Sequence, residues 1–121
     1  MQIQVNTGNG IENKESLERW ADAELRQQLH RFAEEVTRVE VHLSDENAAR
    51  GGQADKRCTM EARLAGHAPI ATSQDAPTQD EAFRGALDKL KRALDTAIGK
   101  RTDHRDRTTI RTAGIDAGLG D

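Results

Sequence analysis

The stretch ALDKLKRAL at residues 86–94 places three basic side chains among leucines that recur at helical spacing. Lys89, Lys91 and Arg92 belong to the two residue types best suited to binding phosphate. The surrounding residues 81–101 contain six bases and three acids, whereas the whole chain has a net charge of −3. A local excess of positive charge on an acidic protein indicates a local anionic target, and structured RNA presents dense phosphate.

A second group of bases lies on an earlier predicted helix, where Arg19, Arg26 and His30 share one outer stripe away from the leucines. If the two helices lie side by side, the bases of both could form one surface. The residues that we expect to contact phosphate are Arg19, Arg26, Lys89, Lys91, Arg92, Lys100 and Arg101.

The alternative is that these charges only solvate the exposed faces of helices, as most charges on helices do. Asp88 and Asp95 are spaced along the helix so that each can pair with Arg92. Such pairing would leave less positive charge for a partner.

The few aromatic residues argue against base-specific recognition of RNA by the sheet. The chain has no Tyr, and Trp20, Phe32 and Phe83 all lie on predicted helices. Modules that stack single-stranded bases on a sheet need aromatic residues on their strands. We expect Phe32 and Phe83 in the core and Trp20 at its edge, with a partner contact as the alternative for Trp20.

The sequence gives little support for a catalytic nucleophile, a metal site or a phosphate-binding loop. Cys58 alternates with Met60 and Leu64, which predicts a buried thiol rather than a nucleophile. The four histidines are far apart and lack metal-ligand spacing, and the glycine-rich turns lack the lysine of a phosphate-binding loop. We therefore expect no catalytic residues, metal, cofactor or small-molecule substrate.

The hydrophobic pattern changes period along the chain and thereby predicts the secondary structure. Period two predicts strands, and a spacing of three or four predicts helices. Thr78 and Glu81 form a T-x-x-E capping box, and Gly99 is the predicted end of the second helix. The predicted elements are a strand at 2–6, a helix of about 22 residues from Asn13, strands at 37–44, 56–66 and about 68–74, and a helix from Thr78 to Gly99.

This order predicts an α+β fold of the β-α-β-β-β-α type, a four-stranded mixed sheet with two helices packed on one face. We expect residues 1–100 to form this domain and residues 101–121 to form a disordered charged tail. No apolar run approaches the roughly 20 residues that cross a bilayer, and the N-terminus lacks a signal-peptide pattern. With a single cysteine as well, the chain is predicted to be cytoplasmic, with no membrane partner.

The chain resembles the ribosome hibernation promoting factor family, also called ribosome-associated inhibitors or ribosomal subunit interface proteins. The resemblance covers about residues 1–101 and rests on the element order together with the segment DKRCTMEARL and the helix LDKLKRAL. Its most specific part is Asp88-Lys89-Leu90 followed by Arg92 and Leu94, which matches the D-K-L-x-R-x-L signature of the family.

The resemblance implies binding to rRNA of the small ribosomal subunit, near the decoding channel, and inhibition of translation during stress. It also implies a short form, because long members add a C-terminal dimerisation domain. Family members continue the last helix with a glutamine and several lysines, whereas this chain has Ala93, Thr96, Ala97 and Ile98 there. That departure predicts weaker or more salt-sensitive binding. The alternative function is a protein-interaction or regulatory module that keeps the fold and has lost ribosome binding.

Overall fold

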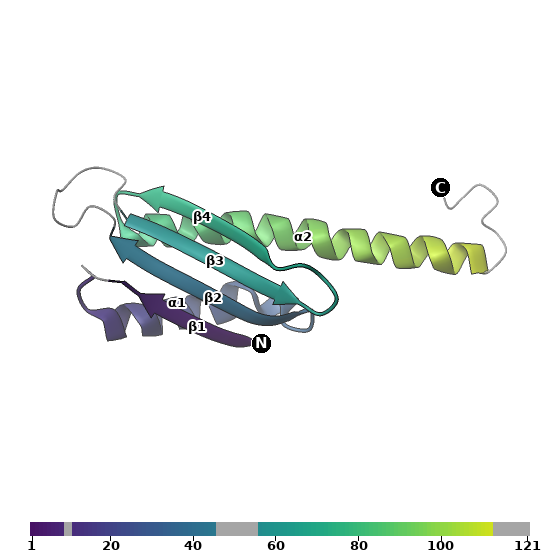
Figure 1. Cartoon of the computed structure of the whole chain (residues 1–121). Helices are drawn as coiled ribbons and strands as arrows, with labels where there is room; N and C mark the ends of the chain where they lie inside the picture. Colours follow the sequence, from purple (N-terminus) through teal and green to yellow (C-terminus); the bar gives the residue numbers. More distant parts are fainter. Residues whose placement is uncertain (9–10, 46–55, 113–121) are drawn as a thin grey trace.

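One mixed sheet and two long helices form the fold, in the predicted β-α-β-β-β-α order with one short 3-10 helix added (Figure 1). The computed structural model describes residues 1–8, 11–45 and 56–112, with side chains described as far as residue 99. The elements are β1 (Gln2–Thr7), α1 (Lys14–Gln28), the 3-10 helix η1 (His30–Phe32), β2 (Val36–Asp45), β3 (Lys56–Leu64), β4 (Ile70–Ala76) and α2 (Gln79–Thr112).

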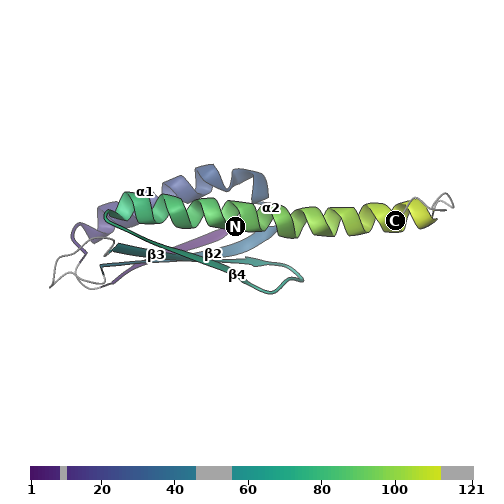
Figure 2. The ribbon, with the colours of Figure 1, turned by 90° about the horizontal axis from the view of Figure 1, so that it is seen from above.

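The sheet has the strand order β1-β2-β3-β4. Strands β1 and β2 pair in parallel through the α1 crossover, and β3 and β4 extend the sheet in antiparallel pairs. Both helices cover the same face of the sheet, which Figure 2 shows from above. The predicted α+β class, the mixed sheet and the placement of both helices are therefore confirmed.

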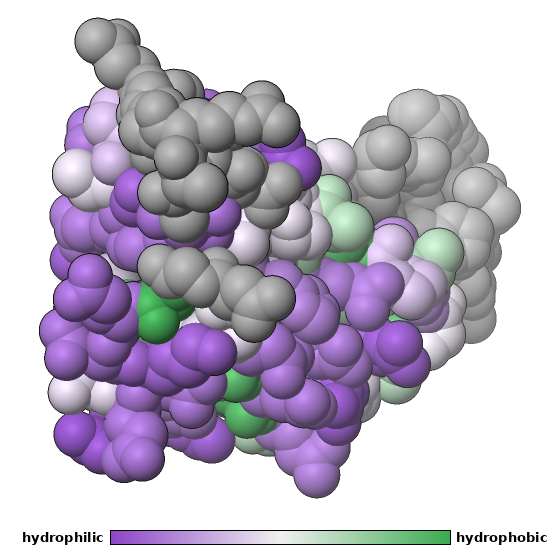
Figure 3. Space-filling model, turned by 60° about the vertical axis from the view of Figure 1, so that its left-hand side comes forward, coloured by the Kyte–Doolittle hydropathy of each residue, from purple (hydrophilic) through white to green (hydrophobic). Residues whose placement is uncertain are grey.

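The core lies between the sheet and the helices and follows the predicted alternation. The strand residues that were expected to point inward are buried, and so is the apolar stripe of α2. The fully or almost fully buried side chains include Val39, Val41, Leu43, Cys58, Met60, Phe83, Leu90 and Leu94. The face of the molecule drawn in Figure 3 is mainly hydrophilic, with apolar residues in small separate patches.

The first helix is shorter than its hydrophobic pattern predicted. It ends at Gln28, after 15 residues, and the chain turns through η1 before β2 begins at Val36. Leu29 leaves the helical conformation at φ −103° and ψ 12°, while Leu29, Phe32 and Val36 remain buried. The prediction of a continuous helix was wrong because tertiary packing keeps these residues apolar without a helix.

The second helix is longer than predicted. Thr78 accepts a hydrogen bond from the Glu81 amide at 3.1 Å, so the predicted N-terminal cap is confirmed. The predicted end at Gly99 was wrong, because α2 continues to Thr112. Gly99 does not adopt the positive φ that a glycine stop requires, whereas Gly66 in the β3–β4 turn does, at φ 73°. The rest of the predicted tail, residues 113–121, lies outside the described residues.

No helix in the described part of the chain is both long and apolar enough to span a membrane.

Replacing Leu90 by Ala tests whether the α2 stripe holds the fold together. Leu90 is fully buried against the sheet. We expect Leu90→Ala to lower the free energy of unfolding by about 2–5 kcal/mol, because it removes apolar contacts and leaves a cavity. Urea denaturation measures this loss. The control, Thr96→Ala at an exposed position of the same helix, is expected to change stability by less than about 0.5 kcal/mol.

Candidate nucleic-acid interface

Three bases on the outer side of α2 point away from the core, and we call Lys89, Lys91 and Arg92 the α2 patch. Lys89 Nζ donates to the Ser73 carbonyl at 2.8 Å, and Lys91 Nζ donates to Gln28 Oε1 at 3.1 Å. Arg92 Nε lies 3.4 Å from the Asp88 carbonyl, which is a long hydrogen bond. None of these partners is a carboxylate, so the charges of the α2 patch are not cancelled by direct ion pairs with the described acids.

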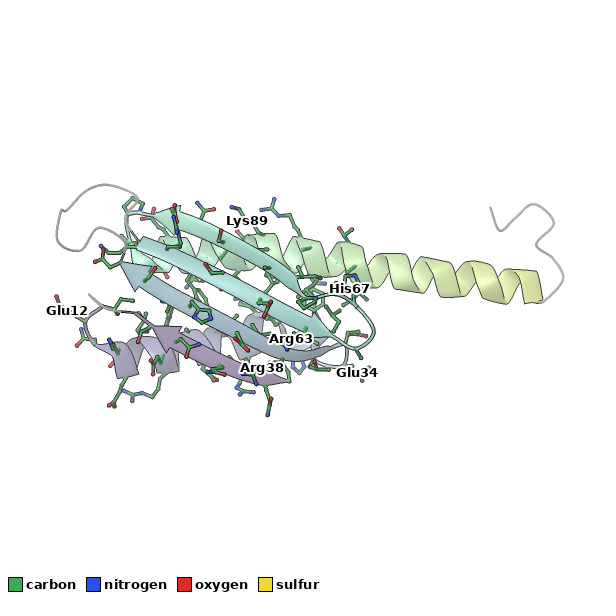
Figure 4. The ribbon with its side chains drawn as sticks, in the orientation of Figure 1. Glu12, Glu34, Arg38, Arg63, His67 and Lys89 are labelled. Atoms are coloured by element: carbon green, nitrogen blue, oxygen red, sulfur yellow. The ribbon has the colours of Figure 1, made fainter. Side chains whose placement is uncertain are left out.

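The helical turn explains why the three side chains point in different directions. Successive residues are about 100° apart around the axis, so Arg92 falls between Lys89 on one flank and Lys91 on the other. Lys89 lies beside β4 (Figure 4), and Lys91 lies beside α1. The α2 patch therefore spans the solvent side of the helix.

An ion pair that the sequence did not reveal removes an acid from this surface. Arg31 in η1 donates two hydrogen bonds to the Asp95 carboxylate, at 2.6 and 3.0 Å. The hydrogen bonds from Arg31 hold the pKa of Asp95 below its ordinary value, with further help from the nearby charges of Arg31 and Lys91. The predicted pairing of Arg92 with Asp95 and with the Asp88 carboxylate was wrong, because Arg31 binds Asp95 and Arg92 contacts only the Asp88 backbone.

The arginines predicted on α1 lie elsewhere and already have acidic partners. Arg26 pairs with Asp22 at 2.7 Å, and Arg19 lies 3.9 Å from Glu15. Both arginines line a groove at the β1 edge of the molecule, which holds three carboxylates and two guanidinium groups. Lys89, in contrast, contacts β4 at the opposite edge. The helices do lie side by side, but the structure does not unite the bases of α1 with Lys89 in one surface.

Lys100 and Arg101 belong to the continuous helix α2, beyond the part whose side chains are described. Both were predicted to contact phosphate, and the structure leaves this prediction untested. Residues 100–112 contain five bases and two acids. The helix carries this segment past the end of the sheet, as Figure 1 shows.

Trp20 occupies the seam between the helices, at the edge of the core. Its ring packs against Phe83 with the centroids 4.7 Å apart, and the Arg84 guanidinium lies over it at 5.7 Å. Arg84 also pairs with Asp80 at 3.0 Å and with Glu24 at 3.5 Å. Trp20 is therefore a core-edge residue, as expected.

The open face of the sheet carries paired charges, one pair between β3 and β4 and two pairs within single strands. Arg57 binds Asp75 at 2.7 Å, and Arg63 lies 3.5 Å from Glu61. Arg38 binds Glu40 at 2.8 Å, and this hydrogen bond lowers the pKa of Glu40. Figure 4 shows Arg38 and Arg63 on this face. Sequence reasoning missed the Arg57–Asp75 pair because it depends on which strands are neighbours.

The chain matches the Sigma 54 modulation protein / S30EA ribosomal protein family over residues 4–102. It belongs to that family. The resemblance to ribosome hibernation factors and ribosomal subunit interface proteins is thereby confirmed. The family consists of ribosome-associated proteins and is not an enzyme family.

Two solved structures share the fold of this S30EA-family protein. The N-terminal domain of Protein Y from Thermus thermophilus aligns with a TM-score of 0.63 and 16% identity, over 79% of this chain and 98% of the other. A ribosomal subunit interface protein from Coxiella burnetii aligns with a TM-score of 0.62 and 16% identity, over 82% and 99%. At such low identity these structures support the fold alone. No curated protein sequence matches the chain.

Cys58 in this family member is a buried core residue. Burial raises the pKa of its thiol from 9.0 to about 12, so almost no reactive thiolate exists at neutral pH. Within the described ranges, no three His, Cys, Asp or Glu side chains are grouped so that they could hold a metal ion.

Replacing Arg31 by Gln tests the Arg31–Asp95 pair through the pKa of Asp95. In Arg31→Gln we expect this pKa to rise towards the ordinary value of about 3.9, because the bidentate donor is lost. A carboxyl group whose pKa is lowered by folding stabilises the protein above its unfolded-state pKa, and this contribution disappears as the pH falls through the folded-state pKa. The part of the stability difference between the wild type and Arg31→Gln that comes from Asp95 should therefore vanish in strong acid, which leaves the contribution of Arg31 over the Phe32 ring.

A carboxyl-carbon NMR titration measures the pKa directly. The matched control is Arg19→Gln, which removes an exposed guanidinium from the other helix and should leave the Asp95 titration unchanged. An unchanged pKa of Asp95 in Arg31→Gln would contradict the assigned pair.

Proposed function

We propose that this protein binds the small ribosomal subunit through contacts between the α2 patch and rRNA phosphates, and that it inhibits translation under stress. It acts in the cytoplasm by occupying its site and catalyses no reaction. The family supplies the association with ribosomes. The observation that carries the proposal is the α2 patch itself, whose three cations have no carboxylate partner among the described residues.

The bases of the α2 patch contribute most to binding in this proposal. Lys89 and Arg92 belong to the family signature, and Lys91 lies between them in sequence. Lys100 and Arg101 extend the contact along α2. Arg19 and Arg26 contribute less, because an rRNA phosphate would have to compete with Glu15 and Asp22 for them. Electrostatic binding of this kind weakens steeply as salt rises, because bound protein cations release counterions from the RNA.

Reversing two charges of the α2 patch tests the proposal. We expect Lys89→Glu/Arg92→Glu to weaken binding to purified small subunits at least about tenfold at low salt. Loss of two phosphate contacts should also reduce the slope of log affinity against log salt by about two. Both residues are exposed, so the fold should persist. Cosedimentation over a salt series measures the affinity and the slope.

The matched control reverses the two arginines of α1. Arg19→Glu/Arg26→Glu changes the net charge by the same amount but acts on the groove that already holds three carboxylates. We expect a distinctly smaller loss than for the α2 double variant. Equal losses would show that binding follows total charge rather than the α2 patch. A wild-type protein that fails to bind subunits at low salt would contradict the proposed function and favour a protein-interaction module that has kept the fold.

A further inference from the structure

A polar cavity opens at the β4 edge of the sheet, and Lys89 is the one residue of the α2 patch that lines it. It has a volume of about 500 Å³ and is lined by Arg57, Thr59, Ser73, Gln74, Asp75 and Lys89. Its residues come from β3, β4 and α2, so only the folded chain assembles it.

The register of the sheet places four of the lining residues as two facing pairs. Arg57 lies opposite Asp75, and Thr59 lies opposite Ser73. Residues two apart on a strand point to the same face, so these pairs share the open face of the sheet. The hydroxyl groups of Thr59 and Ser73 and the guanidinium group of Arg57 therefore lie close together where β3 pairs with β4.

Lys89 reaches this cavity from the helical side of the sheet. Its ammonium group donates to the Ser73 carbonyl at 2.8 Å. Gly85, one turn earlier, lets α2 approach β4 closely, because a Cβ there would lie 2.5 Å from Gln74 Cγ. Thr72 Oγ1 also donates to the Ala86 carbonyl at 2.9 Å. These contacts bring the ammonium group of Lys89, which belongs to α2, to the edge of the open sheet face.

The charge of this cavity has the sign that an anion requires. Among its described lining residues, Arg57 and Lys89 supply two positive charges and Asp75 supplies one carboxylate. Hydrogen bonds from Arg57 lower the pKa of Asp75, and the Lys89 charge lowers it further. Two other cavities in the described part of the chain have the opposite balance of charge. One has three carboxylates and two arginines, and the other has Glu12 and Asp45 with Lys56.

We propose that this cavity binds a backbone phosphate of rRNA, with Arg57 and Lys89 as the cations and the Thr59 and Ser73 hydroxyls as donors. The inference rests on the proposed function and adds the direction in which the rRNA interface extends from the α2 patch. From the α2 patch, the interface continues around the β4 edge onto the open sheet face, not across the seam onto α1. Asp75 is then a competitor, because it occupies Arg57 through two hydrogen bonds, at 2.7 and 3.2 Å.

Two neutralising substitutions with opposite expected effects test the inference. Asp75→Asn should strengthen binding to purified small subunits by about three- to tenfold, because the competing carboxylate is removed. Arg57→Gln should weaken binding by a similar factor and reduce the salt slope by about one. The Arg57–Asp75 pair is about half exposed, so breaking it should cost little stability. Urea denaturation verifies that the variants are folded.

The matched controls are Glu61→Gln and Arg63→Gln, which neutralise another half-exposed pair on the same sheet face. We expect each to change the affinity less than the corresponding Asp75 or Arg57 variant. If all four variants bind alike while Lys89→Glu/Arg92→Glu loses binding, the cavity is not a phosphate site and the proposed function stands. If the wild type binds no subunits at low salt, the proposed function and this inference both fail.

Discussion

The packing of α2 against the sheet determines which charges of this protein can meet a partner. Phe83, Leu90 and Leu94 are fully buried, and together they fix the rotation of the helix about its axis. Because each residue advances about 100° around that axis, the direction of every other side chain follows. Lys89 is thereby turned towards β4, Lys91 towards α1, and Arg92 towards solvent. The same apolar contacts that stabilise the domain also create its cationic surface.

Local pairing explains how an acidic protein can present such a surface. Several of its acidic side chains bind arginines outside the α2 patch and therefore do not neutralise the bases of the patch. Asp22 binds Arg26 on α1, and Asp95 binds Arg31 from η1. Lys89 and Lys91 instead donate to neutral oxygen atoms. Net charge therefore says little about this surface, which depends on the partner of each base.

Sequence periodicity was sufficient to predict the fold and the buried side of each element, but not the partners of the charges. Alternation in β2 and β3 and the stripe of α2 are local signals, and all appear in the structure. The Arg31–Asp95 pair joins residues 64 positions apart, so no local pattern could indicate it. The cavity at the β4 edge likewise requires the β3–β4 register. The end of α1 was misplaced because tertiary packing decided it, and the end of α2 was misplaced because Gly99 does not adopt the positive φ of a helix stop.

The most direct test of the α2 patch as the contact surface is lysine footprinting on the complex. The protein is acetylated under limiting conditions with and without small ribosomal subunits, and each site is quantified by mass spectrometry. Lys89 and Lys91 should be modified more slowly in the complex, whereas Lys14, exposed at the start of α1, should react at an unchanged rate. Protection of Lys14 equal to or greater than that of Lys89 and Lys91 would contradict the account.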